Sequence, residues 1–291
     1  MAARRIAVTG GNGALGRMVV KRLSERADVT ALDIRPGPTG VHSRHCDVES
    51  FYGVRAALQG HDEVVHLAAL LTLDHAEERI FTVNVRGTWN VLEAAHDLGI
   101  QRVVLASSEC TTGVINVRRV PRAPIRYLPI DEDHPLGSVE AYGLSKQVLE
   151  VMGQSYARRG MDIVALRPTL IVMPWMADYI DRTRKIDDPD LWSYVEASDV
   201  VAAIDSALTA PVDGFATAFL SAVDTFSPEP TLAFVERVQG WLPEVRDKDL
   251  YERNPYAALW NLDRARSLLG FEPRSDWRRL LLAGLHTGST R

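Results

Sequence analysis

The stretch Thr9-Gly10-Gly11-Asn12-Gly13-Ala14-Leu15-Gly16 decides the fold of this chain, because it joins a short apolar run to a helical pattern. The apolar run is Ile6 to Val8, and the helical periodicity covers Leu15 to Leu23. Glycine permits a tight turn, lets backbone N–H groups approach a pyrophosphate, and allows a helix to pack closely on a strand. The helix N-terminus favours an anionic group. Three glycines alone also fit an ordinary strand-to-helix turn, so the surrounding sequence has to decide.

Apolar runs and helical patterns alternate through the first half of the chain. The further expected strands are Val29–Leu32, Glu63–Leu67, Arg102–Ala106 and Ile163–Leu166, and the clearest helices are Leu15–Leu23, Phe81–Ala95 and Ala141–Tyr156. This alternation predicts an α/β fold with a Rossmann-like, doubly wound parallel sheet. Beyond Pro168 prolines break the pattern. We expect a nucleotide-binding domain over residues 1–167 and a smaller substrate-binding region over 168–291, interleaved with the Rossmann core.

The composition argues against several kinds of partner. The formal net charge is −5 and basic residues are scattered, so the broad basic surface of a nucleic-acid binder is missing. The two cysteines, Cys46 and Cys110, lack metal-ligand spacing and suit a reducing compartment. No run approaches the roughly 20 apolar residues that span a bilayer, and the first strand leaves no room for a signal peptide. We therefore expect a cytoplasmic protein without nucleic-acid, membrane or metal partners.

An acidic residue ends the second expected strand, in Ala31-Leu32-Asp33. At this distance from the glycine loop, Asp33 can accept hydrogen bonds from the adenosine ribose hydroxyls of a dinucleotide. Asp33 would also repel a 2′-phosphate, so the sequence favours NAD over NADP. Arg35 could reach such a phosphate, although Pro36 after it makes an ordinary turn the more natural interpretation.

Tyr142 and Lys146 are separated by one helical turn, so they share a helix face. A lysine charge near the hydroxyl can lower the pKa of a tyrosine from about 10 toward neutrality. Such a phenol is a general acid and base for a carbinol. By itself this spacing also fits a solvated tyrosine and lysine on a surface helix. The glycine loop upstream favours a proton-transfer centre.

Together these residues resemble the extended short-chain dehydrogenases/reductases, also called NAD-dependent epimerase/dehydratases, over nearly the whole chain. The resemblance rests on several short pieces in a fixed order, which are residues 9–16, Asp33, Cys46-Asp47-Val48, His66-Leu67-Ala68-Ala69, Asn84 to Thr88, Ala106-Ser107-Ser108, Tyr142 to Lys146, Leu166-Arg167-Pro168 and Asn261 to Pro273. The cofactor contacts that it implies involve Gly10, Asn12, Gly13, Ala14, Leu15, Gly16, Asp33, Asp47, Val48, Leu67, Ala68, Ala69, Tyr142, Lys146 and Pro168.

Some of these residues have a structural alternative. The resemblance places Asp47 and Val48 beside the adenine, but Asp47 could instead cap the helix that starts near Glu49. Ala68 and Ala69 would line the cofactor channel, or they could be small residues at a packed strand end. For Asn84 we prefer a structural polar bridge to a ligand contact.

The resemblance implies that Tyr142 is the catalytic acid and base. Lys146 would hydrogen-bond the nicotinamide ribose and lower the pKa of Tyr142, while a serine hydroxyl polarises the reacting oxygen. Ser107 and Ser108 compete for this last role. In the family the catalytic hydroxyl lies four residues before a tyrosine-glycine pair, a tyrosine position that Thr112 fills here, and this spacing selects Ser108.

The residues after Ser108 narrow the reaction. Family dehydratases carry an Asp-Glu pair there, whereas this chain has Glu109-Cys110, which argues against dehydration. The region resembles in part the compact uronate dehydrogenases, which have Asn-His at these positions. We expect an NAD-dependent dehydrogenase acting on a secondary alcohol of a sugar or a sugar-like substrate. The alternatives are a nucleotide-sugar epimerase that retains tightly bound NAD and a non-catalytic NAD sensor.

Candidate substrate contacts are Thr72, Ser108, Glu109, Arg182 and Arg184. Arg182 and Arg184, with Lys185, could hold a carboxylate or phosphate, or they could form a solvated basic patch. Thr72 is equally compatible with an ordinary loop, and Arg167 is expected to be structural. The resemblance also implies a homodimer that forms through the helices bearing Tyr142 and Asn84.

Overall fold

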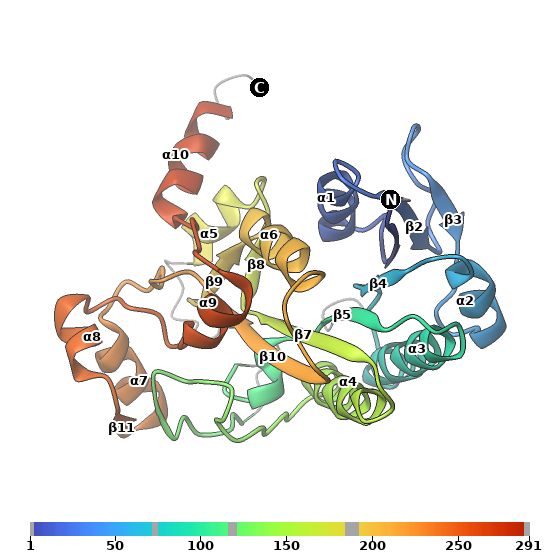
Figure 1. Ribbon diagram of the computed structural model, residues 1–291. Helices are drawn as coiled ribbons and strands as arrows, with labels where there is room; N and C mark the ends of the chain where they lie inside the picture. Colours follow the sequence, from blue (N-terminus) through green and yellow to red (C-terminus); the bar gives the residue numbers. More distant parts are fainter. Residues whose placement is uncertain (1–2, 72–74, 116–120, 184–191, 288–291) are drawn as a thin grey trace.

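A parallel sheet of seven strands lies at the centre of the molecule (Figure 1). The structure is a computed structural model and describes residues 3–71, 75–115, 121–183 and 192–287. Within these residues the strand order is β10-β7-β5-β4-β1-β2-β3. The strands are β1 (Arg5–Thr9), β2 (Asp28–Asp33), β3 (Ser43–His45), β4 (Glu63–His66), β5 (Arg102–Ala106), β7 (Asp162–Pro168) and β10 (Phe215–Leu220). The predicted Rossmann-like parallel sheet is confirmed.

The direction in which the sheet grows reverses at β1. Strands β2 and β3 extend it on one side, and the chain then crosses over to add β4 on the other. In open α/β sheets such a switch point leaves a crevice at the carboxyl ends of the strands, where ligands bind. Thr9 pairs with Leu32 on one side and with His66 on the other. The glycine loop that follows Thr9 therefore starts at this crevice.

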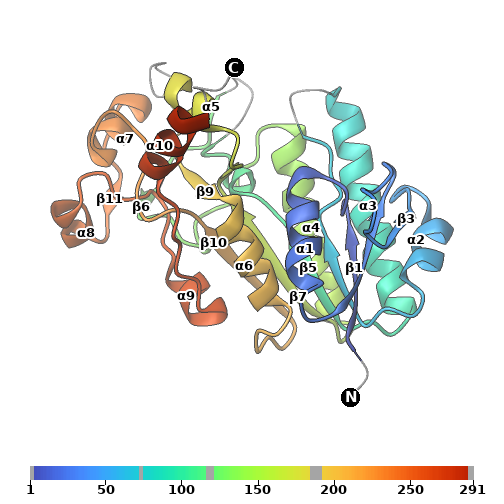
Figure 2. The same cartoon turned by 90° about the horizontal axis from the view of Figure 1, so that it is seen from above.

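Helices cover both faces of the sheet, as Figures 1 and 2 show. One face carries α1 (Ala14–Leu23) and α6 (Ala197–Ala207), and the other carries α2 (Phe51–Leu58), α3 (Glu77–Asp97) and α4 (Ala141–Ala157). Because side chains alternate along a strand, Ile6 and Val8 pack in the apolar cluster under α1 and α6, while Ala7 packs in the cluster on the opposite face. Burial on both faces explains why the strands are almost continuously apolar.

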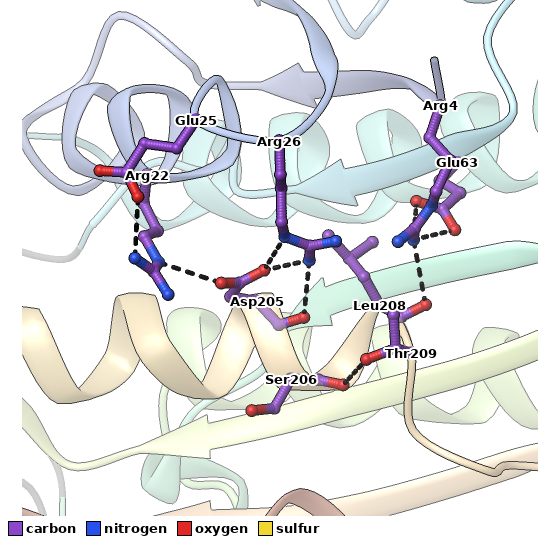
Figure 3. A network of polar contacts seen from close by, with 9 residues as sticks. All are labelled: Arg4, Arg22, Glu25, Arg26, Glu63, Asp205, Ser206, Leu208 and Thr209. Carbon is purple, nitrogen blue, oxygen red and sulfur yellow. Dashed lines mark hydrogen bonds and ion pairs between the residues drawn. The ribbon is translucent and has the colours of Figure 1, made fainter. Parts of the chain in front are cut away.

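Polar contacts fix α6 onto α1, although the two helices are far apart in the sequence (Figure 3). Asp205 of α6 accepts hydrogen bonds from Arg22 Nε at 3.0 Å and from Arg26 Nε at 2.8 Å. Glu25 pairs with Arg22 on the solvent side at 2.8 Å. The second half of the chain is thus attached directly to the first helix of the nucleotide-binding half.

The chain leaves the sheet after Pro168 and returns to it at β10. The excursion contains β8 (Leu170–Val172), α5 (Ala177–Thr183) and β9 (Tyr194–Glu196), and β8 pairs with β9. The elements after β10 are α7 (Thr231–Gln239), β11 (Glu244–Val245), α8 (Lys248–Arg253), α9 (Asp263–Leu269) and α10 (Trp277–Thr287), and β11 pairs with β6 (Tyr127–Leu128). Helix α9 packs through Ala265 and Leu269 in the cluster under α1 and α6. The other elements pack around a separate apolar cluster that contains Trp192, Tyr194, Phe226 and Trp260.

Strand β10 is at the edge of the sheet and pairs with β7 alone in the seven-stranded order. On its outer side the backbone N–H of Phe219 donates to Glu132 Oε1 at 2.7 Å. A side chain from the loop before α4 thus occupies a donor that an edge strand would otherwise present to solvent.

Among the described residues, none of the helices combines the length and the apolar character needed to cross a membrane.

Candidate active site

The glycine loop between β1 and α1 is seated against the end of β4. Gly10 has φ +68°, and a Cβ on it would lie 2.8 Å from the backbone nitrogen of Ala68. A Cβ on Gly16 would lie 2.1 Å from the carbonyl oxygen of Gly10. Both positions therefore require glycine, and the loop brings Gly13, Ala14 and Leu15 to the N-terminus of α1, where backbone N–H groups favour an anion.

Asp33 is buried at the end of β2 beside this loop. Its carboxylate accepts hydrogen bonds from the backbone nitrogens of Asn12 at 3.1 Å and of Arg35 at 2.9 Å. The Asn12 side chain is buried as well, and its Oδ1 has no hydrogen-bond partner in the part of the chain that the structure describes. Such an orphaned polar atom, next to a loop that admits no Cβ at two positions, fits a site completed by a polar ligand.

The residues that follow β3 border the same site. The exposed Asp47 accepts the N–H of Glu49 at 3.0 Å, while Ser50 is the N-cap of α2. Asp47 therefore closes a turn ahead of the helix and does not cap the helix itself. Val48 is buried, and its carbonyl accepts a hydrogen bond from Asn90 of α3 at 2.8 Å. This bond holds these residues against the sheet.

Leu67, Ala68 and Ala69 follow β4 and are partly exposed. The N–H of Leu67 donates to the carbonyl of Thr9 at 3.1 Å, which continues the pairing of β4 with β1. Pro168 ends β7, in register with Leu220 of β10. These residues lie at the carboxyl ends of their strands, on the same side of the sheet as the glycine loop.

Ser108, Tyr142 and Lys146 come together where α4 packs against the end of β5. Ser108 is close enough to Tyr142 to favour the ionised form of its phenol. Ser108 Oγ also accepts the N–H of Cys110 at 3.2 Å, as the N-cap of a short 3-10 helix, η1 (Glu109–Thr112). The Lys146 ammonium lies 5.6 Å from the centre of the Tyr142 ring and donates to the carbonyl of Ala106 at 2.6 Å.

The electrostatics of this group differ from the sequence-based expectation. Burial raises the pKa of Tyr142, and Cys110, Glu140 and Glu109 raise it further, while the interaction with Ser108 acts in the opposite direction. Burial also lowers the pKa of Lys146 to about 8. The expected lowering of the Tyr142 pKa by Lys146 is therefore wrong for the protein groups alone, because desolvation is the largest influence on this phenol.

Ser107 faces a different partner from Ser108. Its hydroxyl donates to Glu150 Oε1 at 2.6 Å, and Glu150 is paired with Arg167 through hydrogen bonds of 2.8 and 2.7 Å. All three side chains are buried. Arg167 is structural, as expected. Ser108 is then the serine of the two that is free to face Tyr142.

Asn84 of α3 links the loop after β4 to α4. Its side chain accepts the N–H of Leu70 at 2.8 Å and donates to the hydroxyl of Ser145 at 3.0 Å. Ser145 in turn donates to the carbonyl of Tyr142 at 2.7 Å. The preferred interpretation of Asn84 as a structural bridge agrees with these contacts.

The structure brings only some of the candidate substrate-contact residues close to Tyr142. Glu109 is buried directly after Ser108 and acts electrostatically on Tyr142. Arg182 is exposed on α5, and its Nε donates to the carbonyl of Asp178 in the same helix at 3.2 Å. Thr72 and Arg184 lie outside the described residues.

The sequence analysis did not identify two acidic residues near the group of Ser108, Tyr142 and Lys146. Glu140, which is buried directly before α4, contributes to the raised pKa of Tyr142. Glu150 continues the spacing of four residues from Tyr142 and Lys146, so all three share one face of α4. That spacing is the feature of the sequence that could have placed Glu150 near Tyr142. Among the described residues no group of three or more His, Cys, Asp or Glu side chains could hold a metal ion.

These features are those of a Rossmann-type nucleotide-binding enzyme, and comparison with known proteins agrees. Residues 6–218 match the model of the NAD dependent epimerase/dehydratase family. The chain therefore belongs to this family, whose members are NAD-dependent enzymes of the short-chain dehydrogenase/reductase type.

Relatives with an assigned activity include sugar dehydrogenases. The chain is 34% identical over 192 residues to an L-arabinose 1-dehydrogenase (NAD(P)(+)) of Haloferax volcanii, a match that covers 64% of this chain and 72% of the relative. It is 33% identical over 169 residues to a uronate dehydrogenase of Pseudomonas putida, covering 56% of this chain and 59% of the relative. The second match thus spans about three fifths of that relative.

A solved structure matches over almost the whole length. It is a short-chain dehydrogenase/reductase superfamily protein from Agrobacterium tumefaciens with bound NAD, at a TM-score of 0.74 and 25% identity, and the match covers 99% of this chain and 98% of that chain. The fold of the C-terminal region is therefore shared as well as that of the central sheet.

Proposed function

We propose that this protein is an NAD-dependent dehydrogenase that oxidises a secondary alcohol of a sugar or a sugar-like substrate. The observation that carries the proposal is that Tyr142 and Lys146 share one face of α4, with the Lys146 ammonium 5.6 Å from the centre of the Tyr142 ring, beside Ser108 at the end of β5. The two sugar dehydrogenases among the relatives support the substrate class. In this proposal Thr72, Glu109, Arg182 and Arg184 border the substrate.

In the proposed mechanism the substrate hydroxyl lies between Ser108 and Tyr142. Ser108 donates a hydrogen bond to the reacting oxygen. Tyr142 first releases its own proton to solvent, and its ionised form then takes the hydroxyl proton as the carbon–hydrogen bond breaks and a carbonyl forms. NAD⁺, when bound, accepts the hydride and places a positive charge that favours the tyrosinate. The raised pKa of Tyr142 makes the neutral phenol the resting form. Tyr142 is therefore poised as a proton donor for the reverse reaction, carbonyl reduction.

In this proposal the nucleotide contacts come from the glycine loop and from the residues at the ends of β2, β3, β4 and β7. The glycine loop with Asn12 would hold the pyrophosphate, Asp33 the adenosine ribose, and Val48 with Asp47 the adenine. Leu67, Ala68, Ala69 and Pro168 would border the nicotinamide half.

Tyr142→Phe tests the assignment, because it removes the hydroxyl and keeps the ring. We expect turnover to fall by about 10²- to 10⁴-fold, the usual contribution of general acid–base catalysis, while NAD binding is kept. NADH release is followed by absorbance with a panel of aldoses, uronates and polyols, and NAD binding by calorimetry. Tyr156→Phe is the matched control, because Tyr156 lies on the same helix and bonds Glu93 away from the site.

Two outcomes would contradict the proposal. Equal turnover in Tyr142→Phe and Tyr156→Phe would remove Tyr142 from the chemistry. Substrate isomerisation without NADH release, by protein that retains nucleotide through purification, would identify an epimerase instead.

We further propose that the protein is a cytoplasmic homodimer. The outer surface of α3 and α4 carries Trp89, Leu144 and Val151, whose exposed fractions are 49%, 43% and 57%. Exposed apolar side chains of this size are found at protein interfaces, and α3 and α4 pack along each other (Figure 2). Both cysteines are buried and neither forms a disulfide, as suits a reducing compartment.

A further inference from the structure

A cavity of about 520 Å³ lies at the edge of the sheet formed by β10 (Figure 1). Its lining comes from β7, β10, α4, α9 and the loop before α4. Ser108, Tyr142 and Lys146 are not among the described residues that line it, and Gln154, which does, follows Tyr142 on α4 by more than three helical turns, or about 18 Å. The cavity has the size of a small-molecule site, and it is separate from the proposed catalytic centre.

A buried guanidinium with an unused donor lines this cavity. The Arg167 side chain is 4% exposed, and its Nε and Nη2 bind the carboxylate of Glu150. Its third nitrogen, Nη1, is buried and has no hydrogen-bond partner in the part of the chain that the structure describes. An unsatisfied buried donor is costly, and more so on a charged group. A ligand oxygen that accepts from Nη1 removes this cost.

The edge of β10 adds backbone groups to the same cavity. The carbonyl of Leu220 faces β7, where it accepts from Thr169, whereas the N–H of Phe219 faces away from β7 and donates to Glu132. Because backbone groups alternate in direction along a strand, the N–H and C=O of Thr217 face away from β7 as well. Thr217 lines the cavity. Its backbone therefore offers one donor and one acceptor there, in addition to its hydroxyl.

The charges around the cavity favour an uncharged ligand. Glu150 is already paired with Arg167. Arg264 Nε lies 3.4 Å from Glu132 Oε2, and Arg264 Nη2 lies 3.1 Å from Asp133 Oδ1. Two guanidiniums thus accompany three carboxylates, so a bound anion adds to an existing excess of negative charge. A hydroxyl group both donates and accepts hydrogen bonds, which matches the mixture of donors and acceptors in the lining.

We propose that this cavity is a second binding site, which takes a neutral polyhydroxylated molecule of monosaccharide size. Ligand hydroxyls accept from Arg167 Nη1 and from the N–H of Thr217, and they donate to the carbonyl of Thr217 and to Glu132. Phe215 lines the same wall and supplies an apolar surface for the ring carbons of a sugar. The inference rests on the cavity and not on the proposed dehydrogenase activity.

Calorimetric titration of the full-length protein with D-glucose, D-galactose and the corresponding uronates, without added nucleotide, tests the proposal. We expect saturable binding of a neutral sugar, and binding of its uronate that is weaker by about tenfold or more, because the excess of carboxylates repels the anion. Thr217→Val keeps the shape of the side chain and removes its hydroxyl. It should weaken neutral-sugar binding by about three- to tenfold, the effect of one lost hydrogen bond.

Two further variants make the result specific to the cavity. Gln154→Ala removes an exposed donor on the α4 side and should weaken binding by a similar factor without affecting the fold, which circular dichroism checks. Thr209→Val is the matched control, because it makes the same change as Thr217→Val at an exposed position after α6. It should leave the Kd unchanged.

Three results would overturn the second site: no binding of either neutral sugar, uronates that bind as tightly as the neutral sugars, or equal Kd values in Thr217→Val, Gln154→Ala and Thr209→Val. The last result would place any bound sugar at the proposed catalytic centre instead. Since no NAD is present and no turnover is measured, each result is independent of whether the proposed dehydrogenase activity is found.

Discussion

Glu150 shows how one buried charge can organise the centre of this protein. Its carboxylate joins three elements, because it accepts a hydrogen bond from Ser107 after β5, is paired with Arg167 of β7, and belongs to α4. Burying a carboxylate is costly unless it is paired and hydrogen-bonded. Both conditions are met here, so the face of α4 that carries Tyr142 is fixed on the ends of two strands.

Glu150→Gln removes the charge while keeping the size of the side chain. We expect the free energy of unfolding to fall by about 3–5 kcal/mol, because Arg167 is left as an uncompensated buried charge. Urea denaturation followed by circular dichroism measures the change. Glu25→Gln breaks an exposed pair with Arg22 and should cost no more than about 1 kcal/mol. Equal effects of the two substitutions would show that the buried pair has no special role.

Among individual residues, the sequence predicted those whose role follows from their spacing to nearby residues in the chain. The spacing of Tyr142 and Lys146 and the position of Ser108 predicted the proposed relay, and these three residues lie together. The roles of Glu150 and Glu140 could not be predicted in the same way, because they depend on contacts between elements distant in sequence. The direction of the Tyr142 pKa shift was wrong for a related reason, since desolvation depends on how completely the folded chain surrounds the phenol.

At the level of secondary structure, His66 connects two strands and a helix. Thr9 of β1 lies 2.7 Å from its Nδ1, and Thr88 of α3 lies 3.1 Å from its Nε2. The Thr88 hydroxyl donates to the carbonyl of Asn84, so it accepts from Nε2, and Nδ1 accepts from Thr9. Burial, with the nearby charge of Lys146, lowers the pKa of His66 to about 3. The neutral ring is therefore the form that holds β1, β4 and α3 together.

This pKa predicts a loss of stability in acid. The unfolded chain takes up a proton on His66 below pH 6.5, whereas the folded chain does not until about pH 3. The contribution is complete above pH 6.5 and falls by up to about 1.4 kcal/mol per pH unit below it. Urea denaturation between pH 6.5 and 5 should show this slope reduced by about 1 kcal/mol per unit in His66→Gln.

His45→Gln provides the comparison, because His45 is exposed on β3. It should keep the wild-type dependence of stability on pH. If His66→Gln and the wild-type protein lose stability equally as the pH falls, the neutral buried ring is not the cause.

The helices and strands that the sequence predicted are those in which apolar residues recur at regular, closely spaced positions. The expected helix Ala141–Tyr156 is observed as Ala141–Ala157, and the expected strand Arg102–Ala106 is observed with the same bounds. Strand β10 was not predicted. Its centre is Ala216, Thr217 and Ala218, which are too small to form an apolar run, and it becomes a strand because β7 offers a parallel partner on the sheet.

At the scale of the whole molecule, the outer surface of α3 and α4 is where the proposed dimer would form. The combined variant Trp89→Glu and Val151→Glu places charges in the apolar interface, which is costly in the dimer and harmless on a free surface. We expect the wild-type protein to have twice the 32.2 kDa mass of the chain and the variant to have the monomer mass. Size-exclusion chromatography with light scattering measures both.

A substitution on another helix checks that the effect is local. Tyr52→Glu changes an exposed aromatic residue of α2 and should leave the dimer intact. A wild-type protein that elutes as a monomer, or a variant that remains a dimer, would refute the proposed interface.

The return of the chain to the sheet at β10 has a consequence for the order in which the protein can be completed during synthesis. Until residue 220 has left the ribosome, β7 remains an uncovered edge, although the strands on its other side and α4 have already been made. Unpaired strand edges on nascent chains are prone to pair with other chains. Residues 169–214 therefore set a delay before the nascent sheet is closed, and Glu132, synthesised much earlier, is already present to cover the last strand when it arrives.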